Sequence, residues 1–386
     1  MIKRINGSIE NIENLTFNGI KEGKNGLGIV VCKGSVAGVF TKNKIKAAPV
    51  KVTMDVVRNG EIEGLIVNSG NANAFTGDLG LENSKKMALL LAEKLGVDEK
   101  KIAVASTGVI GKQLDMSWIS NRFEVVFKNL GNDRQKALSF AKSIMTTDKF
   151  VKECAFKVDD AIVAGIAKGA GMICPNMATM LAFIFTNAHF SSDELQLMLN
   201  KVVERTFNIT VVDGDTSTND MVLLVSVGNK KVDSETFEKA LNEVCFDLAK
   251  KIAKDGEGAT KLIQVIVEGA KNDEDAFKAA KSIVSSLLVK TAIFGNDPNW
   301  GRIVAALGYS NAEVDENLTL AFKNEEKVVL VERGKVLGNE EKARKLLEKS
   351  NEVQILIDLH KGNGKGFAIG CDLSYDYVKI NAEYTT

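Results

Sequence analysis

Histidine is scarce in this sequence, which contains only His189 and His360 among its 386 residues. Imidazole is the commonest metal ligand in proteins and a frequent general base. Two histidines cannot build a histidine-rich metal centre, and a catalytic triad would have to use one of them. His189 lies in an apolar stretch, where a single histidine is usually structural. If the chain is an enzyme, we therefore expect its general base to be something other than histidine.

Net charge, paired cysteines and long apolar runs are also missing. The 50 basic residues balance the 50 acidic ones, which removes the electrostatic case for binding nucleic acid or an anionic membrane. No stretch approaches the roughly 18 apolar residues of a membrane span, and the N-terminus lacks the apolar core of a signal peptide. The five cysteines show no CxxC spacing and have apolar neighbours, which is typical of reduced, buried thiols. We expect a cytoplasmic protein without a metal site.

The length and the hydrophobic pattern predict a mixed α/β (α+β) protein. At roughly 150 residues per domain, the chain is long enough for two main domains, each with its own core. Helical and strand-like segments mix throughout, which favours layered sheets and helices over a bundle or a sandwich. Strict alternation of strands and helices is not evident, so we do not expect a doubly wound parallel sheet.

Apolar residues repeat with helical spacing most clearly over 192–206, behind a Ser191-x-x-Glu194 capping box. The Gly-rich segment 361–367 lacks the spacing of a nucleotide-binding loop and is expected to be a hairpin turn. Further helices are predicted over 81–95, 133–145, 234–254, 273–288 and 338–349, and β-branched runs predict strands near 28–33, 65–67, 102–105, 209–212, 221–225, 262–267 and 353–357.

The most distinctive segment is Lys168-Gly-Ala-Gly-Met-Ile-Cys-Pro-Asn-Met-Ala-Thr179, an irregular loop that leads into an apolar, strand-like run. A threonine at such a junction could be a self-processing site. Its hydroxyl would attack the carbonyl of Ala178, and hydrolysis of the resulting ester would free Thr179 as a new N-terminus. The new α-amine, with an ordinary pKa of roughly 7.7–8.0, could then serve as the general base. Local chemistry alone favours a simpler alternative, in which the glycines form a turn and Thr179 opens a buried strand.

This segment resembles the cleavage motif of the ornithine acetyltransferase (glutamate N-acetyltransferase) family of arginine biosynthesis. Ser106-Thr-Gly-Val-Ile-Gly and Asp213-Gly-Asp-Thr-Ser-Thr-Asn-Asp also resemble family blocks. Cys174, Ala170 and the terminal Thr385-Thr386 depart from the more usual residues. The resemblance extends in family order over nearly the whole chain, through the further blocks at 19–21, 36–50, 68–74, 144–148, 255–261, 294–302 and 371–384.

The resemblance implies roles for the residues that match the family's motifs. Thr107 and Gly108 are expected to form the oxyanion hole of an acyl transfer, where such donors contribute roughly 2.7–4 kcal/mol each. Lys168 would supply the cation for a substrate carboxylate and Glu257 the anion for an ammonium group. Thr147 could exchange roles with its neighbour Thr146. The residues expected to bind the amino-acid substrate are Thr146, Lys168, Thr179, Glu257, Asn381 and Thr386.

The resemblance also implies a reaction and an assembly. Cleavage between Ala178 and Thr179 would give an α fragment, residues 1–178, and a β fragment, residues 179–386, which stay intertwined in a heterotetramer of two α and two β fragments. Thr179 would take the acetyl group from N2-acetylornithine and pass it to L-glutamate by a ping-pong mechanism. No cofactor is expected, and acetyl-CoA would be only a second acetyl donor in a bifunctional enzyme.

Two other functions stay open at this point. A self-processing amidohydrolase or aminopeptidase with an N-terminal threonine would differ only in using water as the acceptor. A non-catalytic amino-acid-binding protein would keep Thr179 inside an intact chain.

Overall fold

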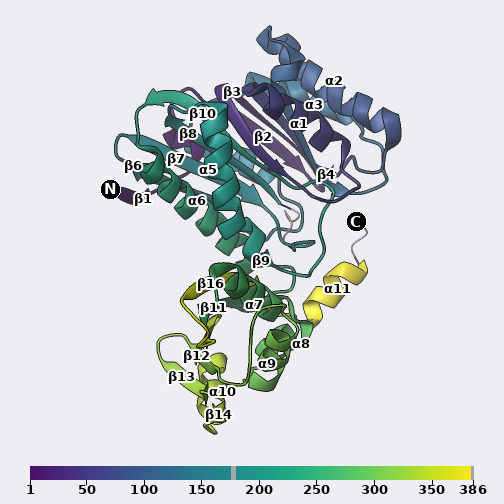
Figure 1. Cartoon of the computed structure of the whole chain (residues 1–386). Coiled ribbons are helices and arrows are strands. Elements are labelled where there is room, and N and C mark those ends of the chain that lie inside the picture. Colours follow the sequence, from purple (N-terminus) through teal and green to yellow (C-terminus); the bar gives the residue numbers. More distant parts are fainter. Residues whose placement is uncertain (175–179, 384–386) are drawn as a thin grey trace.

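Two β-sheets organise the chain, which the computed structural model describes at residues 1–174 and 180–383 (Figure 1). In this part of the chain, nine strands form the larger sheet, in the order β1-β6-β7-β8-β10-β3-β4-β5 with β2 paired to β3. The pairs β8–β10 and β4–β5 are parallel, and the other pairs are antiparallel. The strands are β1 (Ile2–Ile5), β2 (Thr16–Glu22), β3 (Asn25–Phe40), β4 (Glu61–Asn71), β5 (Ile102–Val109), β6 (Lys152–Val158), β7 (Ala161–Lys168), β8 (Leu181–Ala188) and β10 (Met221–Lys230).

Strand β3 joins two halves of the larger sheet. Its first part pairs with β2 and β4, and residues 35–40 pair with β10. The register of the β3–β4 pair shifts between Val31 and Gly34. A Cβ atom at Gly34 would lie 1.9 Å from the carbonyl oxygen of Ser226, so only glycine permits this close approach of β10. The long strand therefore passes from one half of the sheet to the other at a glycine.

Three apolar cores hold this part of the molecule in four layers. The first lies between the two halves of the sheet and includes Val67 of one half and Phe183 of the other. The second packs α5 and α6 against the outer face of β6, β7, β8 and β10. The third packs α2 and α3 against β3, β4 and β5. The helices and 3-10 turns here are η1 (Ile9–Asn11), α1 (Ala48–Asn59), α2 (Gly77–Leu95), η2 (Glu99–Lys101), α3 (Met116–Lys128), α4 (Arg134–Ser143), α5 (Ser192–Arg205), η3 (Phe207–Ile209) and α6 (Ser234–Lys254).

The second sheet lies below the first in Figure 1 and has its own core, which includes residues of α7 to α10. Its strand order is β14-β13-β12-β15-β11-β16-β9. Helix α11 follows the last strand and lies beside both parts of the molecule (Figure 1). The elements are β9 (Thr210–Val211), β11 (Leu262–Ala270), α7 (Asp273–Ser285), α8 (Leu287–Phe294), α9 (Trp300–Gly308), β12 (Thr319–Lys323), β13 (Lys327–Glu332), β14 (Lys335–Val336), α10 (Glu340–Glu348), β15 (Glu352–Asp358), β16 (Gly364–Cys371) and α11 (Tyr375–Glu383).

The layered, mixed α/β architecture with two sheets confirms the class expected from the sequence. The Ser191–Glu194 capping box is present, with both reciprocal hydrogen bonds, at the start of α5. The expected single helix over 273–288 is wrong in detail, because the backbone leaves the helical region at Ser286, whose hydroxyl caps α8 by accepting from the N–H of Val289. No helix in the described ranges combines the length and the apolarity needed to cross a membrane.

The hairpin expected at 361–367 is also wrong. Strands β15 and β16 both pair with β11, one on each side, and not with each other. The N–H groups of Lys361 and Gly362 donate to the carbonyl oxygen of Gly269 at the end of β11. The glycine-rich segment is a turn that crosses the end of β11.

Candidate active site

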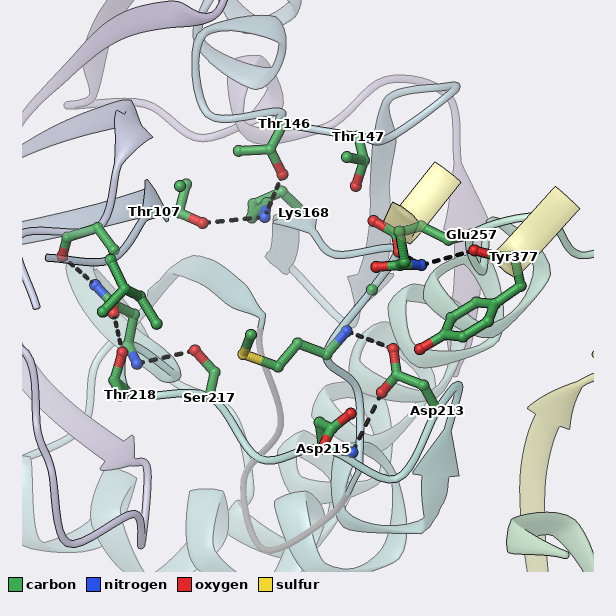
Figure 2. Close-up of a pocket in the computed structure, with 17 residues that line it drawn as sticks. Thr107, Thr146, Thr147, Lys168, Asp213, Asp215, Ser217, Thr218, Glu257 and Tyr377 are labelled. Carbon is green, nitrogen blue, oxygen red and sulfur yellow. Dashed lines mark hydrogen bonds between the residues drawn. The ribbon is translucent and has the colours of Figure 1, made fainter. Parts of the chain in front are cut away.

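A hollow of about 230 Å³ opens where the ends of β5 and β7, the loop after β9 and helix α11 meet (Figure 2). We call it the central hollow. Its walls come from distant parts of the sequence, and neither histidine contributes to them. The lining residues are Ala72, Thr107, Gly108, Ile110, Thr146, Thr147, Lys168, Gly171, Met172, Asp213, Asp215, Ser217, Thr218, Asn219, Glu257, Tyr377 and Asn381.

The central hollow brings together six residues that the sequence assigned to one site. Thr107 and Gly108 end β5, Thr146 follows α4, Lys168 ends β7, Glu257 follows α6 and Asn381 lies on α11. Thr147 lines the same hollow as Thr146. Ala178, Thr179 and Thr386 lie outside the described residues. Met180, next to Thr179 in the chain, donates its N–H to Asp220 Oδ1 at 3.1 Å.

Lys168 is the cation of the central hollow and is only 3% exposed. Its ammonium group donates to Thr146 Oγ1 at 2.8 Å and to Thr107 Oγ1 at 3.1 Å, as Figure 2 shows. Burial lowers the pKa of Lys168, and Asp148 opposes this effect. Two hydroxyl oxygens therefore accept hydrogen bonds from the ammonium group, and its third proton is available for a ligand.

A buried group of three charges lies behind Lys168. The fully buried Lys152 donates to Asp148 Oδ1 at 2.6 Å and to Asp255 Oδ2 at 2.5 Å. Asp148 also accepts from the N–H groups of Gly169 at 2.7 Å and Thr146 at 3.0 Å. The cluster, which we call the Asp–Lys–Asp triad, thus ties the loop at 146–149 and the end of β7 to the end of α6. Its net negative charge faces the positive charge of Lys168.

The residues expected to form the oxyanion hole, Thr107 and Gly108, lie at the end of β5, where β4 approaches so closely that position 108 must be glycine. Gly108 has a φ of +132°, and a Cβ atom there would lie 2.3 Å from the carbonyl carbon of Gly70. The loop that precedes β10 is held against this strand end, because Asn219 Nδ2 donates to the carbonyl oxygens of Ala72 at 2.6 Å and Ser106 at 2.8 Å. These contacts fix the backbone on which the Thr107 hydroxyl and the Gly108 N–H are carried.

Glu257 and Asn381 form the acidic wall of the hollow. Asn381 Nδ2 donates to Glu257 Oε2 at 2.9 Å, and the N–H of Glu257 donates to the carbonyl oxygen of Ala170 at 2.9 Å. A Cβ atom at Gly171 would lie 2.3 Å from Glu257 Oε2, so the glycine leaves room for the carboxylate. Figure 2 shows Tyr377 on the same side of the hollow.

Sequence reasoning gave no role to two acidic residues of this region, Asp213 and Asp220. Asp213 accepts from the N–H groups of Met172 at 2.6 Å and Ile173 at 2.8 Å, and burial raises its pKa. Burial also raises the pKa of Asp220 well above its ordinary value. Asp220 Oδ2 has no hydrogen-bond partner among the described residues. The family-like block 213–220 contains both residues, but its sequence does not show which backbone groups they bind.

No cluster of three or more histidine, cysteine, aspartate or glutamate side chains in the described ranges could hold a metal ion. The chemistry that the described residues offer is that of hydroxyl, ammonium, carboxylate and amide groups around one small cavity. Such groups suit the binding of a small zwitterion and the stabilisation of an oxyanion.

Comparisons with known proteins give a consistent result. The sequence profile of the ArgJ family matches residues 14–386. The chain is 56% identical over 379 residues to the arginine biosynthesis bifunctional protein ArgJ of Archaeoglobus fulgidus, covering 98% of this chain and all of that one. It is 49% identical to the glutamate N-acetyltransferase of Methanosarcina acetivorans, with both chains fully covered. A crystal structure of the arginine biosynthesis bifunctional protein from Bacillus halodurans matches with a TM-score of 0.50 and 48% identity, over 52% of this chain and 98% of that chain.

Proposed function

The chain belongs to the ArgJ family, and from this premise we propose that it transfers an acetyl group from N2-acetylornithine to L-glutamate. The observation that carries the proposal is the central hollow, in which a buried cation, the two hydroxyl groups that it binds and the carboxylate of Glu257 line one cavity of about 230 Å³. A cavity of this size fits an amino acid and its acetyl group, and leaves no space for a macromolecular substrate.

We propose that the nucleophile is Thr179, freed by self-cleavage at Ala178. Its hydroxyl attacks the acetyl carbonyl of acetylornithine while its α-amine takes the hydroxyl proton. Ornithine leaves with that proton, and glutamate then attacks the acetyl-threonine ester through its own amine. The scarcity of histidine supports a base of this kind. The Bacillus halodurans structure also supports cleavage, because the matched chain there spans about half the length of this one.

Thr107 and Gly108 would stabilise the oxyanion in both half-reactions. Thr107 Oγ1 accepts a hydrogen bond from Lys168, so its own proton is free to point toward a ligand. The Gly108 N–H would be the second donor. Because these bonds strengthen as the carbonyl oxygen gains charge, they favour the transition state over the bound substrate.

Lys168 and Thr146 would hold the substrate carboxylate, which is common to acetylornithine and glutamate. Glu257 and Asn381 would contact the nitrogen end of the substrate, with Thr386 as a further contact. One cavity can then serve both half-reactions, since the shared end of each amino acid is recognised and the differing side chain is tolerated.

The proposed cleavage is tested on a denaturing gel. Active protein should give two bands that correspond to residues 1–178 and 179–386, and Thr179→Ala should give one intact, inactive band. A single band from active wild-type protein would refute the self-cleavage mechanism and favour an intact amino-acid-binding protein. We also propose two α and two β fragments per assembly, which the mass in native solution would reveal.

The proposed acceptor is tested by following ornithine release from acetylornithine with and without glutamate. Ping-pong transfer predicts steady release only when glutamate is present. Release that is indifferent to glutamate would support a hydrolase instead.

A further inference from the structure

A second hollow, of about 480 Å³, is lined by Lys44, Lys46, Lys51 and Phe75. It lies between the loop that leads into α1 and the first turn of α2. We call it the lysine hollow. Asp78 is the single acidic residue among those that line it in the described part of the chain. Nothing in the proposed acetyl transfer uses these side chains.

Positive charge is concentrated at the lysine hollow, although the net charge of the chain is zero. Residues 42–51 contain four lysines and no acidic residue. Lys44 and Lys51 are exposed, and neither forms an ion pair or side-chain hydrogen bond with any described residue. Some lysines elsewhere do have acidic partners, as Lys101 has in Glu61 and Glu63. Three lysines line the hollow with a single carboxylate, that of Asp78, so the surplus positive charge favours a multivalent anion.

Phe75 adds an aromatic surface to the charges. Its side chain is 77% exposed although it lines the hollow. Its backbone has a φ of +56°, a conformation that bulky residues rarely adopt. A large apolar ring in water beside lysines offers a face on which a flat heterocycle can stack.

We propose that the lysine hollow binds a nucleotide, with phosphate groups on Lys44 and Lys51 and the heterocyclic base against Phe75. Helices α1 and α2 both begin at this hollow, and their N-cap residues, Ala47 and Thr76, form no side-chain capping bond. In α1 the N–H of Ala48 donates to the carbonyl oxygen of Asn73, and Pro49 has no N–H. Only the first N–H groups of α2 therefore add to the positive potential that the lysines create.

The segments that line the lysine hollow also reach the wall of the central hollow. The N–H of Ala47 donates to the carbonyl oxygen of Thr218 at 3.0 Å, and Thr218 lines the central hollow. Ala72 also lines the central hollow, three residues before Phe75. The nucleotide could be free, acting on the neighbouring site, or it could be the nucleotide part of an acyl thioester such as coenzyme A carries. The second source rests on the proposed acetyl transfer.

Calorimetric titration of the whole protein with ADP and with coenzyme A tests the site. Both ligands should bind, and more weakly at high salt because exposed charges are screened. Lys44→Glu/Lys51→Glu should weaken both by about tenfold or more, the value of one charge-assisted hydrogen bond. Phe75→Ala should weaken both by about fivefold or more through lost stacking. Lys85→Glu/Lys100→Glu makes the same charge change at a different hollow and should leave binding unchanged.

Two results overturn the proposal: neither ligand binds, or the control variant loses as much affinity as the test variant. Transfer from acetylornithine to glutamate is measured on every variant and reports on the central hollow alone. If the wild type shows no such transfer, the acetyl-transfer proposal fails, whatever the titrations show for the lysine hollow. If the wild type acetylates glutamate with acetyl-CoA and the test variants do not, the bound nucleotide is that of the thioester. If ADP changes the rate of transfer from acetylornithine and no thiol is released, the bound nucleotide is a free one. Either of these two results supports the site.

Discussion

Lys168 carries its charge in a place where burial opposes charge. Burial lowers its pKa, and the negative charge of Asp148 counteracts this. Burial would raise the pKa of Asp148, but Lys168, Lys152 and the Gly169 N–H outweigh it and hold that pKa at about 2. The two groups therefore keep one another ionised. The other charged groups that face Lys168 are Lys152, Glu257, Asp220 and Lys21. Burial, and then the charge of Lys168, lower the pKa of Lys21 to about 8.

Asp148→Asn should separate these effects. Without the carboxylate, the pKa of Lys168 falls further, so the alkaline limb of kcat/KM moves to lower pH. KM for glutamate should rise by about tenfold or more with a smaller change in kcat, because a carboxylate contact weakens in ground state and transition state alike. Steady-state kinetics between about pH 6 and 10 measure both. Asp247→Asn, at an ion pair with Arg4, is the control, and an unshifted profile in Asp148→Asn would contradict the argument.

The same substitution predicts a change in acid stability. The lowered pKa of Asp148 means that its ionised form stabilises the fold. This contribution is present above about pH 4 and is lost as the pH falls toward 2. Asp148→Asn lacks it at neutral pH, so its free energy of unfolding should change less between these pH values than that of the wild type.

Roles for residues could be proposed from the sequence only where one segment contains the groups that the chemistry needs. The scarcity of histidine and the segment ending in Thr179 pointed to an unusual base, and the family resemblance named Thr107 and Lys168. The Asp–Lys–Asp triad was not predictable, because a charged residue in a sequence is normally solvated. Lys152 and Asp255 are 103 positions apart, and only the fold shows that they share a buried bond.

Elements with their own local signals were predicted best. The capping box and the apolar residues of α5 all lie within one short stretch of sequence, and the apolar residues of α6 likewise lie within one stretch. Helix α1 was not predicted, although Pro49 fits its first turn, where the missing N–H of proline is not needed. Strands β6 and β7 were missed as well, since tertiary packing decides short strands more than propensity does.

The capping box gives an element-scale prediction. In α5, Ser191 Oγ accepts from the N–H of Glu194, and the Glu194 carboxylate accepts from the N–H of Ser191 at 2.9 Å. Ser191→Ala removes the first of these bonds and should lower the free energy of unfolding by about 0.5–2 kcal/mol. Helix α5 packs on the outer face of the sheet, so acetyl transfer should be unchanged. Urea unfolding measures the loss, Ser192→Ala is the matched control, and equal losses in the two variants would refute the capping role.

At the scale of the whole molecule, the proposed cleavage site lies in the sequence between two neighbouring strands of one sheet, β7 and β8. Strands β8 and β10 follow Thr179 in the chain, yet they lie between β7 and β3, which precede it. Cutting the chain there would leave the β7–β8 and β3–β10 hydrogen bonds in place. The resemblance gave the position of the proposed cut, but this strand order depends on pairing between distant segments, which local patterns do not reveal. The two proposed fragments are therefore expected to behave as one body.

Lys152 joins the two proposed fragments at a single buried atom, because its ammonium group binds Asp148 of the first and Asp255 of the second. Lys152→Met leaves two carboxylates buried without their cation and should lower the free energy of unfolding by about 3–5 kcal/mol. Adding Asp255→Asn removes one of these charges, while Asp148 keeps the N–H groups of Gly169 and Thr146, so the double variant should regain part of the loss. Lys239→Met, at an exposed pair with Glu235, is the control and should leave the free energy of unfolding nearly unchanged, because solvent screens exposed ion pairs. Urea titration followed by size-exclusion chromatography measures both stability and fragment separation. If the triad joins the fragments, Lys152→Met separates them at a lower urea concentration than the wild type, and equal midpoints would show that the sheet alone holds them together.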